Sequence, residues 1–273
     1  MPTVDPCEMP RHGLTSIMRV ERQLPSQLGE QLAQLALTCT DATLPVNLDN
    51  LAAALGVQSV RVADLHEDGR TTWVGGRPHI EVRADRTPQR QRFTLAHELA
   101  HVLLANNRET DVRLRTKSFD QPAEERLCDW IAAAILMPLA WVQPLAARPM
   151  TLSRLRAIAT SADTSLSAAA VRVSEVGRRP CMLLRWRRSP RGQWVLVGMA
   201  GVPTEFVGKT SVTGATHDRL EAVSARSMRT EVELAIDGVP IEVRSAEVCL
   251  RGGTLLMLIT EALRPAAGRP GTS

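Results

Sequence analysis

Residues 92–107 read RFTLAHELAHVLLANN, and the interpretation of the whole chain starts from this stretch. Its apolar residues recur at helical spacing, which predicts a helix from about Gln89 to Asn106. On that helix His97 and His101 lie about one turn apart on the same face, with Glu98 on the adjoining flank. Two neutral imidazoles so placed suit a zinc ion. The alternative is a packed helix that carries two incidental histidines, and it predicts no third ligand elsewhere.

A second helix, predicted from about Ala123 to Leu136, offers the missing ligand. Glu125 follows His101 at a distance that allows a loop and a return helix to bring its carboxylate across the first helix. Asp129 lies one turn further on, where it could accept a hydrogen bond from the outer N–H of a ligand histidine. The neighbouring Glu124 is the other candidate ligand, and solvated helix charge is the alternative reading of all three.

The composition fits a folded intracellular protein. The chain has 273 residues, of which 44% are hydrophobic, and its net charge of +4 permits nucleic-acid contact without demanding it. The five cysteines are scattered and form no CxxC pair, so neither a disulfide framework nor a structural zinc cluster is indicated. We find no charged and apolar leader and no apolar run of about 18 residues, so we expect a cytoplasmic protein without a membrane segment.

The pattern of helices and strands predicts an α+β protein with several parts. Strand-like segments and an Asp68–Gly69 turn precede the helix that carries the two histidines. After the helix at 123–136, two short helices are predicted at about Leu152–Thr160 and Ser165–Val176. Further strands follow, including a hairpin at Asp237–Gly238. We predict a disordered segment at 1–24, a domain with the candidate metal site at 25–148, a helix-turn-helix-like segment at 149–178, a β-rich domain at 179–265 and a disordered tail at 266–273.

These motifs resemble a known family. Three segments are similar to the ImmA/IrrE metallopeptidases: Arg92 to Leu104, ERLCD at 125–129 and AAAILMP at 132–138. The segment PVNLDNLAAALGV at 45–57 matches the family's entry helix, and the resemblance covers about residues 25–177. At Leu127–Cys128–Asp129 the chain departs from the Glu–Ala–Asn that members often carry, and Trp130–Ile131 replaces a more usual pair, which changes the surroundings of the site without removing a required group.

The resemblance implies a zincin-like fold and a proteolytic function. It makes His97, His101 and Glu125 the ligands of a zinc (Zn²⁺) or manganese (Mn²⁺) ion and Glu98 the catalytic base. The implied substrate is a helix-turn-helix transcriptional repressor, whose cleavage releases stress-response or mobile-element genes; a prophage or toxin–antitoxin setting is a further possibility. The β-rich 180–264 segment is similar, by position and strand content alone, to the GAF-like sensor domain of the IrrE branch.

An oxyanion donor is also expected in such a site. The chain has no tyrosine, so the candidates are Arg172, His79, His217 or backbone N–H groups. We predict Arg172, whose helix is expected near the core in this family. The alternative is that Arg172 only pairs with an acidic neighbour.

The competing function is a DNA-binding or ligand-sensing regulator with a vestigial peptidase fold. Arginines at 154, 156, 185, 187, 188 and 191 supply positive charge for DNA. However, the helix at 165–176 is mostly small and apolar, whereas a recognition helix needs side chains that reach base edges. The intact histidine and glutamate motif favours the enzyme, and direct DNA binding is the less favoured reading.

Overall fold

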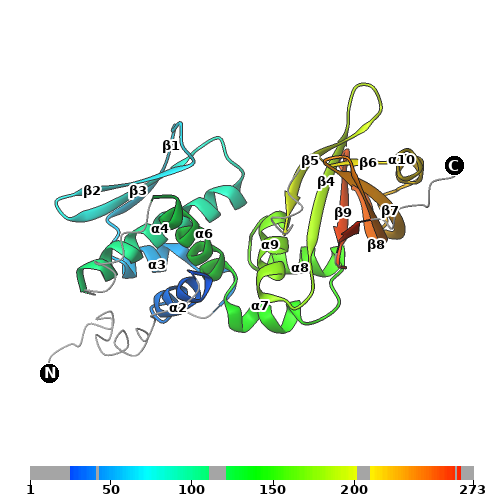
Figure 1. Cartoon of the computed structure of the whole chain (residues 1–273). Coiled ribbons are helices and arrows are strands. Elements are labelled where there is room, and N and C mark those ends of the chain that lie inside the picture. The colour runs from blue at the N-terminus through cyan, green and yellow to red at the C-terminus, as the bar shows by residue number, and fades with distance from the viewer. Residues whose placement is uncertain (1–24, 41–42, 111–120, 202–209, 262, 266–273) are drawn as a thin grey trace. The chain divides into compact units, whose positions relative to one another are not determined.

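The computed structural model describes residues 25–40, 43–110, 121–201, 210–261 and 263–265. Contacts divide the chain into two compact units (Figure 1). The first takes the chain up to Leu139 together with Thr160–Ser165. The second takes Ala140–Ala159 and the chain from Leu166 onward. The predicted disordered segments at 1–24 and 266–273 lie outside the described residues.

In its described residues, the first unit joins helices to a small sheet. The helices are α2 (Pro25–Leu37), α3 (Leu48–Ala54), α4 (Pro88–Thr110) and α6 (Gln121–Leu136). The strands are β1 (Ser59–Ala63), β2 (Gly69–Val74) and β3 (Arg77–Arg83), in the order β1-β3-β2. β1 runs parallel to β3 and β2 runs antiparallel to it, so β2 forms an edge of the sheet. The predicted helices and strands of this region are confirmed.

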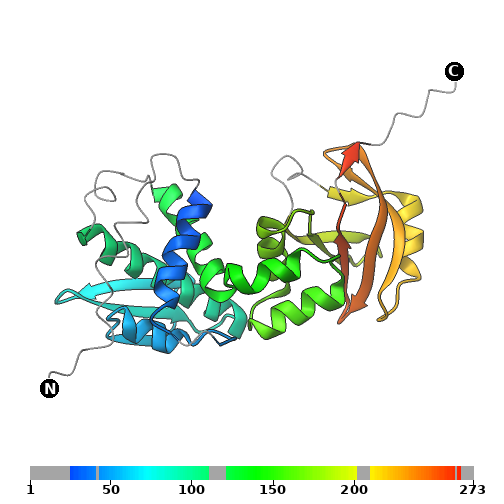
Figure 2. The same ribbon diagram turned by 90° about the horizontal axis from the view of Figure 1, so that it is seen from below.

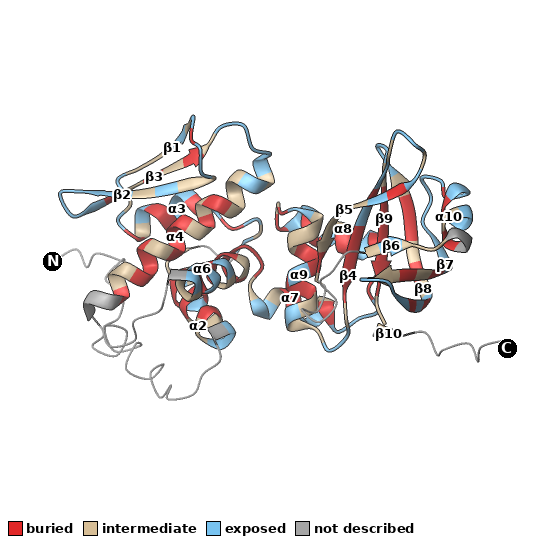
Figure 3. Cartoon of the chain, turned by 45° about the horizontal axis from the view of Figure 1, so that its top comes forward, coloured by how far each residue is buried: buried red, intermediate tan, exposed pale blue. Residues whose placement is uncertain are grey.

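The core of this unit lies between the helices and one face of the sheet. α4 contacts β2, β3 and α6, while α2 packs along the other side of α6 (Figure 2). Leu99 and Leu103 of α4 and Leu127 and Ile131 of α6 are fully buried in one core cluster. Figure 3 shows buried segments along both helices. The broad apolar faces of the two helices therefore fix their crossing, and with it the positions of their polar residues.

Local signals explain where several elements begin and end. The Asn47 side chain accepts hydrogen bonds from the backbone N–H of Asp49 and Asn50, both at 3.0 Å, and so caps the start of α3. Gly75 and Gly76, both with positive φ, form the turn between β2 and β3. α4 extends to Thr110, past its predicted end, and residues 111–120 lie outside the described part of the chain.

The second unit joins helices to an antiparallel sheet. Its helices are α7 (Leu139–Ala146), α8 (Leu152–Ser161), α9 (Leu166–Val176) and α10 (Gly214–Glu221). Its strands are β4 (Met182–Arg188), β5 (Trp194–Ala200), β6 (Thr210–Val212), β7 (Met228–Ile236), β8 (Val239–Arg251), β9 (Thr254–Ile259) and β10 (Arg264–Pro265). The strand order is β5-β4-β9-β8-β7-β6, with β10 beside β8. The chain is thus α+β, as predicted.

The central strands carry the core of this sheet. Trp186, Met257 and Val248 are fully buried on β4, β9 and β8 (Figure 3). The predicted hairpin at Asp237–Gly238 is confirmed: both residues have positive φ, and Ile236 pairs with Val239. α7, β6 and α10 were not predicted. α6 ends at Leu136, as predicted, but α7 begins directly after Pro138.

α8 and α9 have the bounds expected for the helix-turn-helix-like pair, within two residues. α9 contacts β4 and β5 and buries Ala169, Ala170 and Val173. Its Ser174 hydroxyl donates a hydrogen bond to the carbonyl of Gly201 at 3.3 Å. The small residues of α9 therefore serve packing against the sheet. In the described residues no single helix is long and apolar enough to span a membrane, and one bent pair, Pro122–Leu136 with Leu139–Ala146, meets that test only jointly.

Candidate metal centre

α4 presents its two histidines side by side. The Nε2 atoms of His97 and His101 are 3.2 Å apart, as expected for residues one helical turn apart. Leu99 on the opposite side of the helix and its neighbour Ala100 are fully buried, so the core fixes the rotation of α4 about its axis. The side chain of His97 keeps 15% of its surface exposed and that of His101 keeps 25%, so both remain accessible to solvent.

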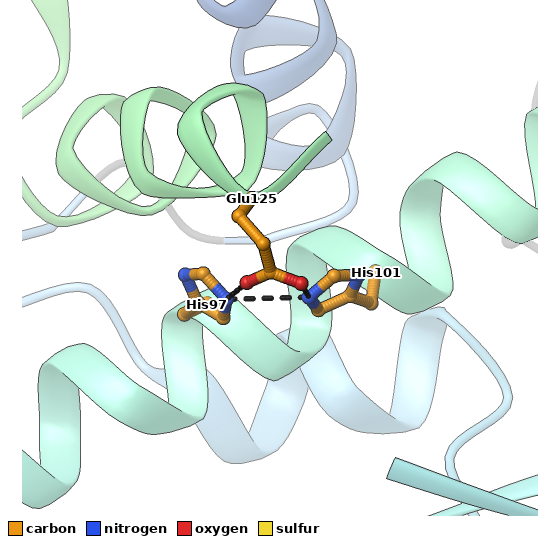
Figure 4. Close-up of side chains that lie close together, drawn as sticks. All are labelled: His97, His101 and Glu125. Atoms are coloured by element: carbon orange, nitrogen blue, oxygen red, sulfur yellow. Dashed lines mark hydrogen bonds and ion pairs between the residues drawn. The ribbon is translucent and has the colours of Figure 1, made fainter. Parts of the chain in front are cut away.

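α6 brings Glu125 across the histidine pair. Its Oε2 lies 3.1 Å from Nε2 of His97, and its Oε1 lies 3.5 Å from Nε2 of His101 (Figure 4). One donor atom from each of the three residues lies within 4.8 Å of the other two. Two imidazole nitrogens and one carboxylate oxygen are the donor set of a catalytic zinc site with an open fourth position. The residues present therefore fit a metal ion of this kind.

Glu124 occupies a different position from Glu125. Its Oε1 lies 3.7 Å from Nδ1 of His101, the outer ring nitrogen, whereas Glu125 faces the two Nε2 atoms. Of the two glutamates that the sequence left open, Glu125 is the one gathered with the histidines. Glu124 borders the ring from outside.

Each outer ring nitrogen meets a polar atom of α6. Oδ1 of Asp129 lies 2.9 Å from Nδ1 of His97, as predicted for this residue. Sγ of Cys128 lies 3.4 Å from Nδ1 of His101, a contact the sequence did not suggest. Burial, reinforced by the charge of Glu124, raises the pKa of the Cys128 thiol far above its usual range. Cys128 therefore remains a neutral thiol.

Opposing effects act on the pKa of His97. Burial lowers this pKa, but the hydrogen bond with Asp129, together with the charges of Asp129, Glu98 and Glu125, outweighs burial. The pKa of His97 is consequently raised above its ordinary value of 6.5. A metal-free centre of this kind holds a proton more readily than an isolated histidine.

Glu98 is held by the edge strand β2. The Thr71 hydroxyl donates a hydrogen bond to Oε2 of Glu98 at 2.7 Å, and Glu98 is only 8% exposed. Thr71 pairs with the fully buried Ile80 of β3, so both side chains share the sheet face that α4 covers. A Cβ atom on Gly69 would lie 2.4 Å from Cγ2 of Thr94 and 2.8 Å from Oε1 of Glu98. Glycine is therefore required where β2 passes Glu98.

A cleft of about 310 Å³ lies over these groups, lined by Asp68, Gly69, Arg90, Phe93, Thr94, His97, Glu98, Glu125 and Asp129. At its rim the Asp68 carboxylate accepts hydrogen bonds from Arg86 (2.7 Å) and Arg90 (2.8 Å). These two bonds lower the pKa of Asp68 below 3.8, against the smaller opposing effect of burial. Asp68 thus ties the start of β2 to the start of α4.

The other predicted candidates belong to other elements of the fold. Arg172 belongs to the second unit, is 2% exposed, and has Glu175 4.0 Å away, so its role as an oxyanion donor stays a prediction. His79 contacts the Ser59 hydroxyl at 2.8 Å within the sheet. His217, also in the second unit, contacts the carbonyl of Gly192 at 3.3 Å.

Thr71, Gly69, Asp68 and Cys128 were missed as participants in the site. Their contacts with α4 join positions far apart in the sequence, and no spacing rule connects a strand residue to a particular helix face. A signal existed only for Cys128, which departs from the family pattern beside the ligand candidate.

Two histidines one helical turn apart, with a glutamate between them in sequence and a second glutamate from another helix, form a candidate metal centre. Residues 52–174 match the family model of the IrrE N-terminal-like domain, Peptidase M78. This part of the chain therefore belongs to the ImmA/IrrE family of metallopeptidases. No curated protein matches the chain significantly.

Among solved structures, a Mycobacterium tuberculosis transcriptional regulator resembles the chain with a TM-score of 0.46 and 15% sequence identity. The similarity covers 87% of this chain and 81% of the regulator. A similarity at this level carries no functional argument.

Proposed function

We propose that the chain is a metal-dependent endopeptidase, with His97, His101 and Glu125 as the metal ligands and Glu98 as the catalytic base. The observation that carries the proposal is the gathering of the three donor atoms within 4.8 Å, next to a buried glutamate that lines the same cleft. Asp129 supports it, because a carboxylate on the outer nitrogen of His97 fixes the ring with Nε2 turned toward Glu125.

When bound, the zinc ion (or manganese) would activate a water molecule and polarise the carbonyl of the scissile bond. Glu98 has one carboxylate oxygen hydrogen-bonded to Thr71, which restricts the rotation of the group. Glu98 accepts a proton from the attacking water and delivers it to the leaving amine nitrogen. The cleft beside β2 receives the peptide.

We further propose that the substrate is a helix-turn-helix transcriptional repressor and that cleavage derepresses stress-response or mobile-element genes in the cytoplasm. This step rests on the family of residues 52–174. The proposed domain division, 25–148, 149–178 and 179–265, assigns cleavage to the first part and leaves a GAF-like sensing role to the last.

Elemental analysis of the purified full-length chain tests the metal centre. We expect about one zinc or manganese ion per chain in the wild type, loss of this ion in Glu125→Ala and retention of it in Glu124→Ala. Glu124→Ala is the matched control, because it removes a neighbouring carboxylate of the same helix. Absence of bound metal, with no stabilisation on adding either ion, would reject the proposal.

Glu98→Gln separates binding from catalysis. We expect this variant to keep its metal, because the metal ligands are unchanged. It should no longer cleave a repressor whose gene lies near the gene of this protein, because the amide accepts no proton from water. Cleavage at the wild-type rate would reject the role of Glu98. If the chain shifts the electrophoretic mobility of DNA in a salt-dependent way and does not cleave the repressor, the competing regulator function is favoured.

A further inference from the structure

We propose that Cys128 is a positioning residue for His101: its thiol sulfur accepts the hydrogen bond that the outer ring N–H of His101 donates. The inference rests on the proposed function, because it takes His101 as a metal ligand. It assigns to the two histidines different outer partners, a carboxylate for His97 and a neutral thiol for His101.

One face of α6 supplies all the groups involved. Glu125 and Cys128 are three positions apart and Glu125 and Asp129 are four apart, so their side chains emerge on the same side of the helix. Glu125 reaches the two Nε2 atoms, while Cys128 and Asp129 reach the two Nδ1 atoms. Cys128 is fully buried, so solvent does not compete with its contact to His101.

The protonation of a ligand histidine requires such a partner. With Nε2 turned toward the metal, a neutral imidazole carries its proton on Nδ1, and this N–H needs an acceptor. The Cys128 sulfur lies 3.4 Å from Nδ1, within hydrogen-bond reach for sulfur. The Glu124 oxygen lies at 3.7 Å, beyond the usual range for an N–H···O bond. These distances make the Cys128 sulfur, rather than the Glu124 carboxylate, the acceptor of the hydrogen bond that Nδ1–H of His101 donates.

The chemistry of sulfur gives the contact a consequence. A thiol is a weak acceptor, whereas a carboxylate is a strong one, so Cys128 holds the ring of His101 less strongly than Asp129 holds the ring of His97. A hydroxyl at the same position preserves the hydrogen bond, and an apolar group of similar size removes it. Cys128→Ser and Cys128→Val therefore separate the hydrogen bond from packing.

The test is zinc affinity of the full-length chain, measured by competition with a chromophoric chelator, beside the visible spectrum of the cobalt-loaded protein. We expect Cys128→Val to weaken zinc binding by about tenfold or more and to change the cobalt spectrum. Cys128→Ser should stay within about threefold of the wild type, since it rescues the bond. Glu124→Gln, the matched control, should bind zinc like the wild type.

Packing is controlled by thermal unfolding of each metal-free variant, and Cys128→Ala serves as a second apolar variant if Cys128→Val does not fold. Wild-type affinity in both apolar variants, or a loss in Glu124→Gln alone, would overturn the assignment. A wild-type chain that binds no zinc would instead overturn the proposed metal centre, and the two failures are therefore distinguishable.

Discussion

The Thr71 hydroxyl on β2 donates a 2.7 Å hydrogen bond to Oε2 of Glu98 on α4. It is a direct side-chain link between the edge strand of the first unit and the helix that carries both histidines. Because Glu98 is 8% exposed, its carboxylate depends on protein donors rather than on water. The edge strand therefore sets the direction in which Glu98 faces the cleft.

Replacing Thr71 tests this link. Thr71→Val keeps the shape of the side chain but leaves the buried carboxylate without this donor, so we expect the free energy of unfolding to fall by about 1–3 kcal/mol. Urea denaturation measures the change. The control is Thr72→Val, an exposed position on the same strand. In a Glu98→Gln background the loss should shrink, and an unchanged loss would show that Thr71 acts through something other than Glu98.

Gly69→Ala should destabilise the first unit by steric overlap. The added Cβ would lie 2.4 Å from Cγ2 of Thr94, and overpacking of this kind costs about 1–3 kcal/mol. Adding Thr94→Ser removes that methyl group and should recover part of the loss, which thermal unfolding would report. A double variant no more stable than Gly69→Ala would mean that the contact with Glu98, not Thr94, dominates.

The ion pairs of Asp68 should contribute to acid sensitivity. The pKa of this carboxyl is lowered by hydrogen bonds from Arg86 and Arg90, so its contribution to stability is present above pH 3.8 and is lost as the pH falls through the depressed value. We expect Asp68→Asn to be less stable than the wild type at neutral pH and to approach the stability of the wild type in acid. Denaturation at a series of acid to neutral pH values measures the difference in the free energy of unfolding. The double variant Arg86→Gln/Arg90→Gln should reduce the change of this free energy with pH. A difference that does not vary with pH would contradict the prediction.

Asp163 combines an unusual backbone with side-chain contacts. Its φ is 48°, it accepts a hydrogen bond from Gln89 at 3.3 Å, and its Oδ2 lies 3.9 Å from Nε of Arg92. Asp163→Ala should cost about 1–2 kcal/mol, because alanine tolerates left-handed backbone poorly and makes neither contact. Asp163→Asn should cost less, since asparagine tolerates this backbone and keeps an acceptor. Asp163→Gly removes the contacts without backbone strain, so its thermal unfolding isolates the effect of the contacts. If Asp163→Gly is as unstable as Asp163→Ala, backbone strain does not contribute.

The sequence predicted those parts of the centre that depend on spacing within a helix. His97 and His101, like Glu125 and Asp129, are four positions apart, so helical geometry alone places each pair on one face. Their apolar neighbours then force α4 and α6 to face each other. Sequence spacing could not predict the approach of β2, because Thr71 meets Glu98 through the register of the sheet and the tilt of α4.

Two other misses have separate reasons. α6 ends at Leu136, as predicted, but the proline that follows also suits the start of a helix, and α7 begins at once. α10 reads GATHDRLE, a polar stretch with little apolar periodicity, and its packing against β7 marks it as a helix. For α10, tertiary contacts outweigh the local sequence signal.

The segment Thr160–Ser165 belongs to the first unit, although the chain on either side of it belongs to the second. Within it, Asp163 contacts Gln89 and Arg92, and the buried Thr164 donates a hydrogen bond to the sulfur of Met137 at 3.9 Å. The first unit is therefore not severable by one cut. A fragment ending at residue 148 would lack these contacts, and a cleavage of the chain between α7 and α8 would leave the first unit dependent on both pieces.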